Sequence, residues 1–334
     1  MGCIFRLIVL VALLAVAYGQ TAQEQLASAH QLLEMGNNDA AIAKLNDMAA
    51  RYPTVKGINH ELGVGYYRKA EYLNAIGHLK RALQENANDQ DAIQLLGLAY
   101  YLAGRPADAI PYLEKLDRNR AGQNRDAAFV LGLCYIIARE YDKALATFSQ
   151  LYGLPAGSAS SRVVFARILL LQGFDPVAEE QAQAALKEAP RIPLAHFILG
   201  QVYLYRSDLP RAIGELTAEL ALNPGYSPAL TRLGNAYILA GRLDEAQSVL
   251  QRSIWLDADS AESYVLLGKV QLRRGQFAVA ARNLERAIAT DPNNYIAHHL
   301  LGEAYEKMGQ IEAAKREMRI AAQIQQTQTT RPTR

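Results

Sequence analysis

The sequence predicts an all-α protein, an α-solenoid in which antiparallel helix pairs stack one on another. Three observations predict it. The chain repeats every 34 residues, apolar residues recur three and four positions apart within each repeat, and glycine or proline stands at the expected helix ends in many of the repeats. Half of the 334 residues are hydrophobic and 20% are charged, so the chain can bury a long core.

Residues 1–19 have the layout of a secretory signal peptide. Arg6 precedes an uncharged apolar run at residues 7–17, and small residues follow, so cleavage fits after Gly19 or after Ala17. The run is shorter than the roughly 17 to 25 residues that cross a bilayer. We therefore expect a signal cleaved near Gly19, an exported protein (periplasmic or secreted), and no stable membrane insertion afterwards; a retained anchor is the alternative.

Cysteine usage fits an exported protein that is stabilised by packing alone. Removal of the signal takes Cys3 with it and leaves Cys134 as the single cysteine of the mature chain. No disulfide can then form within one chain. Because Cys134 lies in the apolar stretch LGLCYII, we expect it to be a small buried hydrophobic residue.

Nine copies of the repeat follow one another, with Asn124 as the only extra residue. They occupy residues 22–55, 56–89, 90–123, 125–158, 159–192, 193–226, 227–260, 261–294 and 295–328. Position 20 is alanine in every copy and position 8 is glycine in seven. We expect these two positions to face each other and to let the two helices of a repeat approach closely. Glycine at position 15 of six copies suits a left-handed helix end, and proline at position 32 of four copies ends the second helix.

The best copy, residues 261–294, carries a family resemblance. Its matching residues are Tyr264, Leu267, Gly268, Ala280, Leu284, Ala287 and Pro292. This pattern resembles the tetratricopeptide repeat family, and the resemblance covers residues 22–328. It implies antiparallel helix pairs in a right-handed superhelix whose inner, concave surface is lined mainly by the first helix of each pair.

The array divides where its spacing loosens. Repeats 1–4 fill residues 22–152 and repeats 5–9 fill residues 159–328. Glycine, proline and serine gather at 153–161, so we expect a hinge there, with a longer ordered loop as the alternative. The polar stretch from residue 325 has no apolar stripe, and we expect a disordered tail that includes 329–334.

No motif for catalysis or for a cofactor appears. His30, His60 and Glu34 fall near one another in the repeat alignment, but a zinc site needs three or four ligands in fixed geometry. We therefore expect no metal, no cofactor and no enzyme activity. The 35 Lys and Arg residues nearly balance the 33 Asp and Glu residues, so nucleic acid is not an expected partner.

The family geometry places positions 2, 5, 9, 12 and 13 of the first helices in the groove. The candidate binding residues at these positions are Tyr67, Leu98, Tyr101, Phe129, Leu133, Phe197, Tyr205, Asn235, Lys269 and Arg273, and Ile136 and Ile238 share the pattern. The middle of the predicted groove is apolar and its C-terminal end is polar and charged. Some of these side chains pack between helices in the alternative reading.

These features predict an exported, non-catalytic scaffold that binds a protein or peptide segment along its groove, with aromatic anchors. The alternative is an accessory subunit of a polysaccharide or protein export or assembly system in the cell envelope. The sequence leaves the oligomeric state open.

Overall fold

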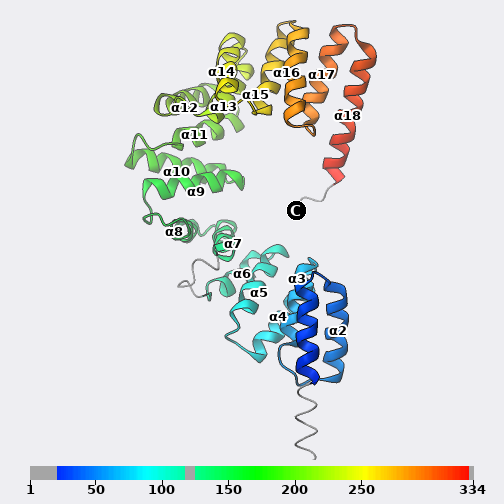
Figure 1. Ribbon diagram of the computed structural model, residues 1–334. Helices are drawn as coiled ribbons and strands as arrows, with labels where there is room; N and C mark the ends of the chain where they lie inside the picture. Colours follow the sequence, from blue (N-terminus) through cyan, green and yellow to red (C-terminus); the bar gives the residue numbers. More distant parts are fainter. Residues whose placement is uncertain (1–20, 117–124, 331–334) are drawn as a thin grey trace, which may run out of the picture. The chain divides into compact units, whose positions relative to one another are not determined.

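The computed structural model describes residues 21–116 and 125–330, with side chains up to residue 328. Every regular element in these ranges is an α-helix (Figure 1). The chain divides into two compact units, Met1–Gly157 (unit 1) and Ser158–Arg334 (unit 2). The predicted all-α class is confirmed, and the division falls inside the segment 153–161. The predicted signal peptide lies outside the described residues.

Unit 1 contains the helices of repeats 1–4. They are a segment at 21–34, α2 (Asn38–Arg51), α3 (Ile58–Arg68), α4 (Tyr72–Glu85), α5 (Gln90–Leu102), α6 (Pro106–Leu113), α7 (Arg125–Ile137) and α8 (Tyr141–Leu151). The segment 21–34 and the odd-numbered helices are the first helices of their repeats, and the even-numbered helices are the second.

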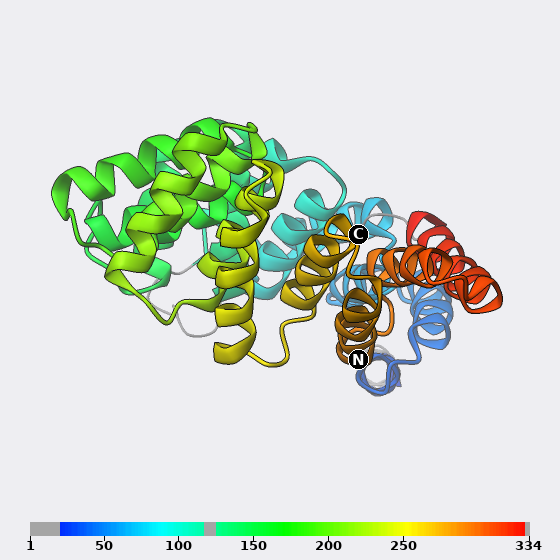
Figure 2. The same cartoon turned by 90° about the horizontal axis from the view of Figure 1, so that it is seen from above.

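Unit 2 contains repeats 5–9 in the same order (Figure 2). Its helices are α9 (Ala159–Leu171), α10 (Asp175–Glu188), α11 (Ala195–Tyr205), α12 (Leu209–Leu222), α13 (Ser227–Leu239), α14 (Leu243–Leu256), α15 (Ala261–Arg273), α16 (Phe277–Thr290), α17 (Tyr295–Lys307) and α18 (Ile311–Thr330). Among the described helices, none has the length and apolar character that spanning a bilayer requires.

Within each unit the helices pack as a solenoid. Each second helix packs against the first helix of its own repeat and against the first helix of the next repeat. First helices of neighbouring repeats also touch, whereas neighbouring second helices make no comparable contact in the described ranges. Each unit therefore curves with its first helices on the inner side, and the surface they form is the inner face of that unit.

The close approach within a repeat brings position 8 against position 24 more closely than against the predicted position 20. A Cβ added at Gly200 would lie 2.6 Å from Leu216 Cγ, and one at Gly234 would lie 2.6 Å from Leu250 Cγ. These partners stand at position 24, one helical turn beyond the alanine at position 20, because side chains on a helix point back toward its N-terminus. Glycine at position 8 thus forms the notch that receives position 24. The alanines at position 20 are buried as well.

The turn between the two helices of a repeat has the expected left-handed residue. The six glycines at position 15 have φ between 72° and 79°. In the other three repeats Ala70, Arg139 and Ser207 occupy this position with φ of 59°, 60° and 59°. Because all nine repeats adopt the conformation, the turn itself is the constant feature, and glycine is only its least strained residue.

The C-terminal end departs from the expected disordered tail. Helix α18 continues to Thr330, so residues 325–330 are helical, and residues 331–334 lie outside the described ranges. The stretch has no glycine or proline before Pro332, and glutamine is a good helix former, so nothing in the sequence stops the helix earlier.

Candidate binding surface

A hollow lies on the inner face of each unit. In unit 2, α11 and α13 border a hollow of about 160 Å³. It is lined by Gln201, Leu204, Tyr205, Arg232, Asn235 and Leu239. In unit 1, a hollow of about 360 Å³ lies against the segment 21–34, α3 and α5. Both hollows are lined by repeat positions 6, 9, 12 and 13, so the same positions form the accessible inner face in both units.

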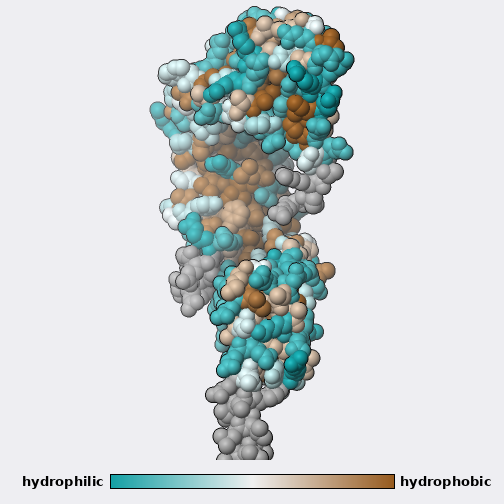
Figure 3. Space-filling model, turned by 45° about the vertical axis from the view of Figure 1, so that its right-hand side comes forward, coloured by the Kyte–Doolittle hydropathy of each residue, from teal (hydrophilic) through white to brown (hydrophobic). Residues whose placement is uncertain are grey.

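Exposed apolar side chains recur at position 13, where each first helix ends. In unit 2 they are Leu171, Tyr205 and Leu239, which are 74%, 66% and 50% exposed and form the apolar row. Leu102 and Ile137 hold the same position in unit 1, with 45% and 50% exposed. Figure 3 shows apolar surface gathered over α9 and α11. Apolar side chains at one repeat position in five successive repeats are a pattern, unlike the scattered exposed leucines of most surfaces.

A polar row runs beside the apolar row in unit 2. Position 9 is Arg167, Gln201, Asn235 and Lys269 in repeats 5 to 8. Arg167 is exposed and Lys269 is half-buried, and neither makes an ion pair within the described residues. Arg273 stands at position 13 of repeat 8, next after the apolar row. It donates a hydrogen bond from Nη1 to the Ile238 carbonyl oxygen, at 2.7 Å. This face thus offers apolar contact bordered by cations.

In unit 1 the charges of the first repeats pair with one another instead. The Arg68 Nη2 atom donates to Glu34 Oε1 at 2.9 Å, and Arg68 also bonds the Leu33 carbonyl oxygen. That hydrogen bond holds the pKa of the Glu34 carboxyl below its usual range. The ring Nδ1 of His30 lies 3.1 Å from Glu61 Oε1. These pairs link neighbouring repeats, so Arg68 already has an acidic partner within unit 1.

The histidines weighed as possible metal ligands contact carboxylates one at a time. His60 Nδ1 lies 2.8 Å from Asp89 Oδ2, and His30 pairs with Glu61. No group of three or more His, Cys, Asp or Glu side chains in the described ranges is arranged to hold a metal ion. His30 thus joins repeat 1 to repeat 2, and His60 contacts the N-cap residue of α5.

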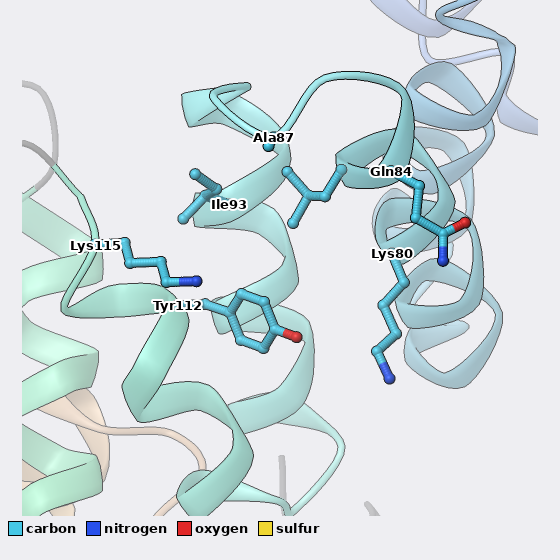
Figure 4. Close-up of a pocket in the computed structure, with 7 residues that line it drawn as sticks. Lys80, Gln84, Ala87, Ile93, Tyr112 and Lys115 are labelled. Carbon is cyan, nitrogen blue, oxygen red and sulfur yellow. The ribbon is translucent and has the colours of Figure 1, made fainter.

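A further hollow, of about 320 Å³, lies between α4 and α6 in unit 1 (Figure 4). Two lysines line it, and a tyrosine contacts each of them. A hydrogen bond with the Tyr100 hydroxyl raises the pKa of Lys80, and Lys115 Nζ lies 5.7 Å from the centre of the Tyr112 ring. The two rings stack at 5.7 Å. We assign this cluster to the packing of repeats 2 and 3.

Four of the ten predicted binding residues lie on the accessible inner face of unit 2. Tyr205 is the most exposed of them, Asn235 borders the same hollow, and Lys269 and Arg273 supply positive charge. Tyr67, Leu98 and Tyr101 are half-buried on the inner face of unit 1. Burial raises the pKa of the Tyr67 and Tyr101 phenols.

Three predicted residues belong largely to the packing between helices. Leu133 is only 7% exposed, so its prediction as a binding residue is corrected: it fills the core of unit 1. Phe129 packs edge to face on Phe148 with ring centres 5.5 Å apart, and Phe197 does so on Tyr226 at 5.1 Å. Ile136 and Ile238 are also buried.

Sequence reasoning missed four of the five exposed apolar residues at position 13: Leu102, Ile137, Leu171 and Leu239. The signal was present in the repeat alignment. Position 13 is charged in the first two repeats, apolar in the next five, and charged again in the last two. That uninterrupted apolar run in one column has no role in the helix pairing and marks the surface directly.

Comparison with known proteins places the repeats in a family. A family model described as tetratricopeptide repeat matches residues 203–269 and 271–330, and a second model of that description matches 60–124, 95–159 and 164–227. The TPR repeat-containing protein MJ1428 of Methanocaldococcus jannaschii is 24% identical over 123 residues, which are 37% of this chain and 22% of that protein. The match thus spans about a fifth of that relative.

Solved structures of other proteins match about half of this chain. The crystal structure of MamA is 24% identical, with a TM-score of 0.45, and covers 49% of this chain and 96% of its own. That of YrrB, described as a TPR protein with an unusual peptide-binding site, is 20% identical, with a TM-score of 0.44, and covers 51% of this chain and 87% of its own.

Proposed function

The chain belongs to the tetratricopeptide repeat family, and from this premise we propose that it is a scaffold whose inner face in unit 2 binds a segment of a partner protein. The observation that carries the proposal is the apolar row. Leu171, Tyr205 and Leu239 stand at the same position of three successive repeats and are each at least half exposed. Covering such side chains removes apolar surface from water, which favours binding by roughly 25 cal/mol for each Å² of apolar surface buried.

The hollow beside the row supports binding of a side chain from a partner. Its apolar lining comes from Leu204, Tyr205 and Leu239, and its polar lining from Gln201, Asn235 and Arg232. A hollow with apolar walls and a few polar groups is the usual receptor for an anchor residue. Tyrosine at this place can contribute large contact area at small cost in rotamer freedom.

The proposal is binding without catalysis. Catalysis would need a nucleophile or an acid and base held within hydrogen-bond distance in a water-excluding pocket. In the described part of unit 2, the inner face instead combines aliphatic side chains, amides and cations around an open hollow. This chemistry suits recognition of a segment along its length.

We also propose that the protein acts outside the cytoplasm, on the strength of the signal-like residues 1–19. N-terminal sequencing of the chain recovered from a secretion-competent host tests this. We expect a mature chain that begins at Gln20 or Tyr18. A secreted or membrane-bound product that still begins at Met1 would overturn cleavage.

The binding function is tested by selecting peptides from a random display library on the full chain. Selected peptides should bind the wild type and lose at least about tenfold in affinity for the variant Leu171→Ser/Tyr205→Ala/Leu239→Ser. The matched control is Leu73→Ser/Trp255→Ala, which removes side chains that are 71% and 81% exposed on second helices. Selected peptides that bind both variants equally would overturn the proposal.

A further inference from the structure

The charges that border the apolar row define what can cover it. The four first helices α9, α11, α13 and α15 carry five cations and one carboxylate: Arg162, Arg167, Arg232, Lys269, Arg273 and Glu262. Arg232 is bound to Glu262, and Arg162 donates to Gln181. Arg167, Lys269 and Arg273 are left without an acidic partner within the described residues. The fifth first helix, α17, adds Glu303, Glu306 and Lys307. The first helices of unit 2 therefore hold six cations and three carboxylates, a local excess of positive charge in a chain whose net charge is only +2.

The uncompensated cations lie on both sides of the apolar row along the stack. Arg167 stands at position 9 of repeat 5, and Lys269 and Arg273 stand at positions 9 and 13 of repeat 8. The apolar residues Leu171, Tyr205 and Leu239 come from repeats 5, 6 and 7. A partner that covers the row therefore meets a cation at each end, and burying those charges without an acid would oppose binding.

We infer that the bound segment is an acidic amphipathic helix, with one apolar stripe for the apolar row and carboxylates near Arg167, Lys269 and Arg273. This inference rests on the proposed function of the inner face of unit 2. It narrows the partner from any protein segment to one with a stated charge and pattern.

The repeat spacing supports a helix as the conformation of the segment. Packed helices lie roughly 8 to 10 Å apart, so successive residues of the apolar row are separated by about that distance. An α-helix rises 1.5 Å per residue and returns to the same face after seven residues, a rise of about 10.5 Å. One apolar residue in every seven can thus meet each residue of the row. From repeat 5 to repeat 8 the stack spans three such steps, so a helix of about 21 residues covers it.

The test uses three synthetic peptides of about three heptads each. The first has a leucine stripe flanked by glutamate, the second has lysine in place of every glutamate, and the third has serine in place of every leucine. Each is labelled with fluorescein and titrated with the full chain, and anisotropy gives the dissociation constant. We expect the first peptide to bind at least about tenfold more tightly than either of the others.

A charge reversal in the protein should invert this preference. The variant Arg167→Glu/Lys269→Glu should bind the lysine peptide more tightly than the glutamate peptide. The matched control, Arg282→Glu/Arg319→Glu, makes the same change in charge at two exposed arginines of the second helices α16 and α18. It should keep the wild-type preference, and circular dichroism should show equal helicity for both variants.

The outcomes separate the inference from the proposed function. Equal binding of the glutamate and lysine peptides, both lost in the Leu171→Ser/Tyr205→Ala/Leu239→Ser variant, overturns the acidic partner and leaves the binding face in place. A glutamate peptide that does not bind also overturns the inference, while the display selection decides the function. A single-stranded oligonucleotide that displaces the glutamate peptide at equal concentration would assign the cations to nucleic acid and overturn the inference as well.

Discussion

The inner faces of the two units are built from the same repeat but carry opposite charge. The first helices of unit 1 hold five carboxylates and two cations, whereas those of unit 2 hold three carboxylates and six cations. In unit 1 the charges are used between repeats, as in the pairs Arg68–Glu34 and His30–Glu61. In unit 2 Arg167 and Lys269 have no such partner among the described residues. The residues that pack the helix pairs are thus similar in both units, whereas the charged residues on the first helices differ between them.

The comparison predicts that unit 1 can be weakened without disturbing the binding face of unit 2. Phe148 is 1% exposed and packs on Phe129, so Phe148→Ala should destabilise unit 1 by about 3 to 5 kcal/mol. Cys134 reports this, because it is buried in unit 1 and burial raises the pKa of its thiol to about 12. A thiol reagent should therefore label it only when unit 1 opens, and labelling should become at least about a hundredfold faster in the variant.

The chains used for labelling carry Cys3→Ser, so that Cys134 is their single thiol. The control is the affinity of the glutamate peptide for the same Phe148→Ala chain. Since neighbouring repeats interact mainly with each other, we expect the affinity to stay within about twofold of the wild type. A variant that loses the peptide together with unit 1 would show that the binding surface is not confined to unit 2.

The dependence of peptide affinity on ionic strength should distinguish the cations of the two inner faces. Exposed charges are screened strongly as the ionic strength rises, so the affinity for the glutamate peptide should fall by about tenfold from about 0.05 to about 0.5 M NaCl. Arg68→Gln should leave this slope unchanged, since Arg68 already pairs with Glu34 in unit 1. Lys269→Gln should reduce the slope. Equal slopes for Lys269→Gln and Arg68→Gln would remove the distinction between paired and unpaired cations.

Limited proteolysis should locate the boundary between the two units. The segment between α8 and α9 has no helix, and Tyr152 at its start is 44% exposed. Chymotrypsin should cleave after Tyr152 at least several-fold faster than after Tyr205 or Trp255, which are more exposed but lie in helices. Cleavage in the helices of either unit before the segment 153–161 is cut would contradict the predicted hinge.

The sequence predicted the structural positions of the repeat much better than the surface positions. Ala75 and Ala212 are buried as expected because an alanine repeated at one position reports packing in every copy. The choice between positions 12 and 13 was harder, since one residue turns the helix by about 100°. That single step separates the buried Ile238 from the exposed Leu239. A family pattern fixes the phase of a helix only to about one residue, so the groove residues were partly misplaced.

Contacts between different helices also escaped the sequence. Phe129 and Phe197 read as groove aromatics, but their partners Phe148 and Tyr226 come from other helices, and no single column of the alignment contains both. Charge pairing escaped the sequence for another reason. Glu34 and Arg68 stand at the same position 13 of neighbouring repeats, yet the column does not say that they pair, or that Arg273 at this position instead donates to a carbonyl oxygen. The conformation of the side chains decides the partner, and the structure shows it.

The smallest expected effect tests the paired charge of unit 1 by pH. The Arg68 hydrogen bond lowers the pKa of Glu34 from its ordinary 4.5, so folding favours the carboxylate. The stability it contributes is present above pH 4.5 and is lost as the pH falls through the lowered pKa. Glu34 is exposed, so Glu34→Gln should lower the Tm by at most about 2 °C at pH 7, and the difference should shrink as the pH falls below 4.5.

Lys269→Gln is the matched variant in unit 2, measured by the same thermal melts followed by circular dichroism. Because Lys269 has no ion-pair partner in the described ranges, removing its charge should leave the Tm unchanged at neutral and at acidic pH. A fall in Tm at pH 7 as large as that of Glu34→Gln would mean that Lys269 is already neutralised within the chain. Its charge would then stabilise the fold, as that of Arg68 does in unit 1, and would no longer be available to a partner.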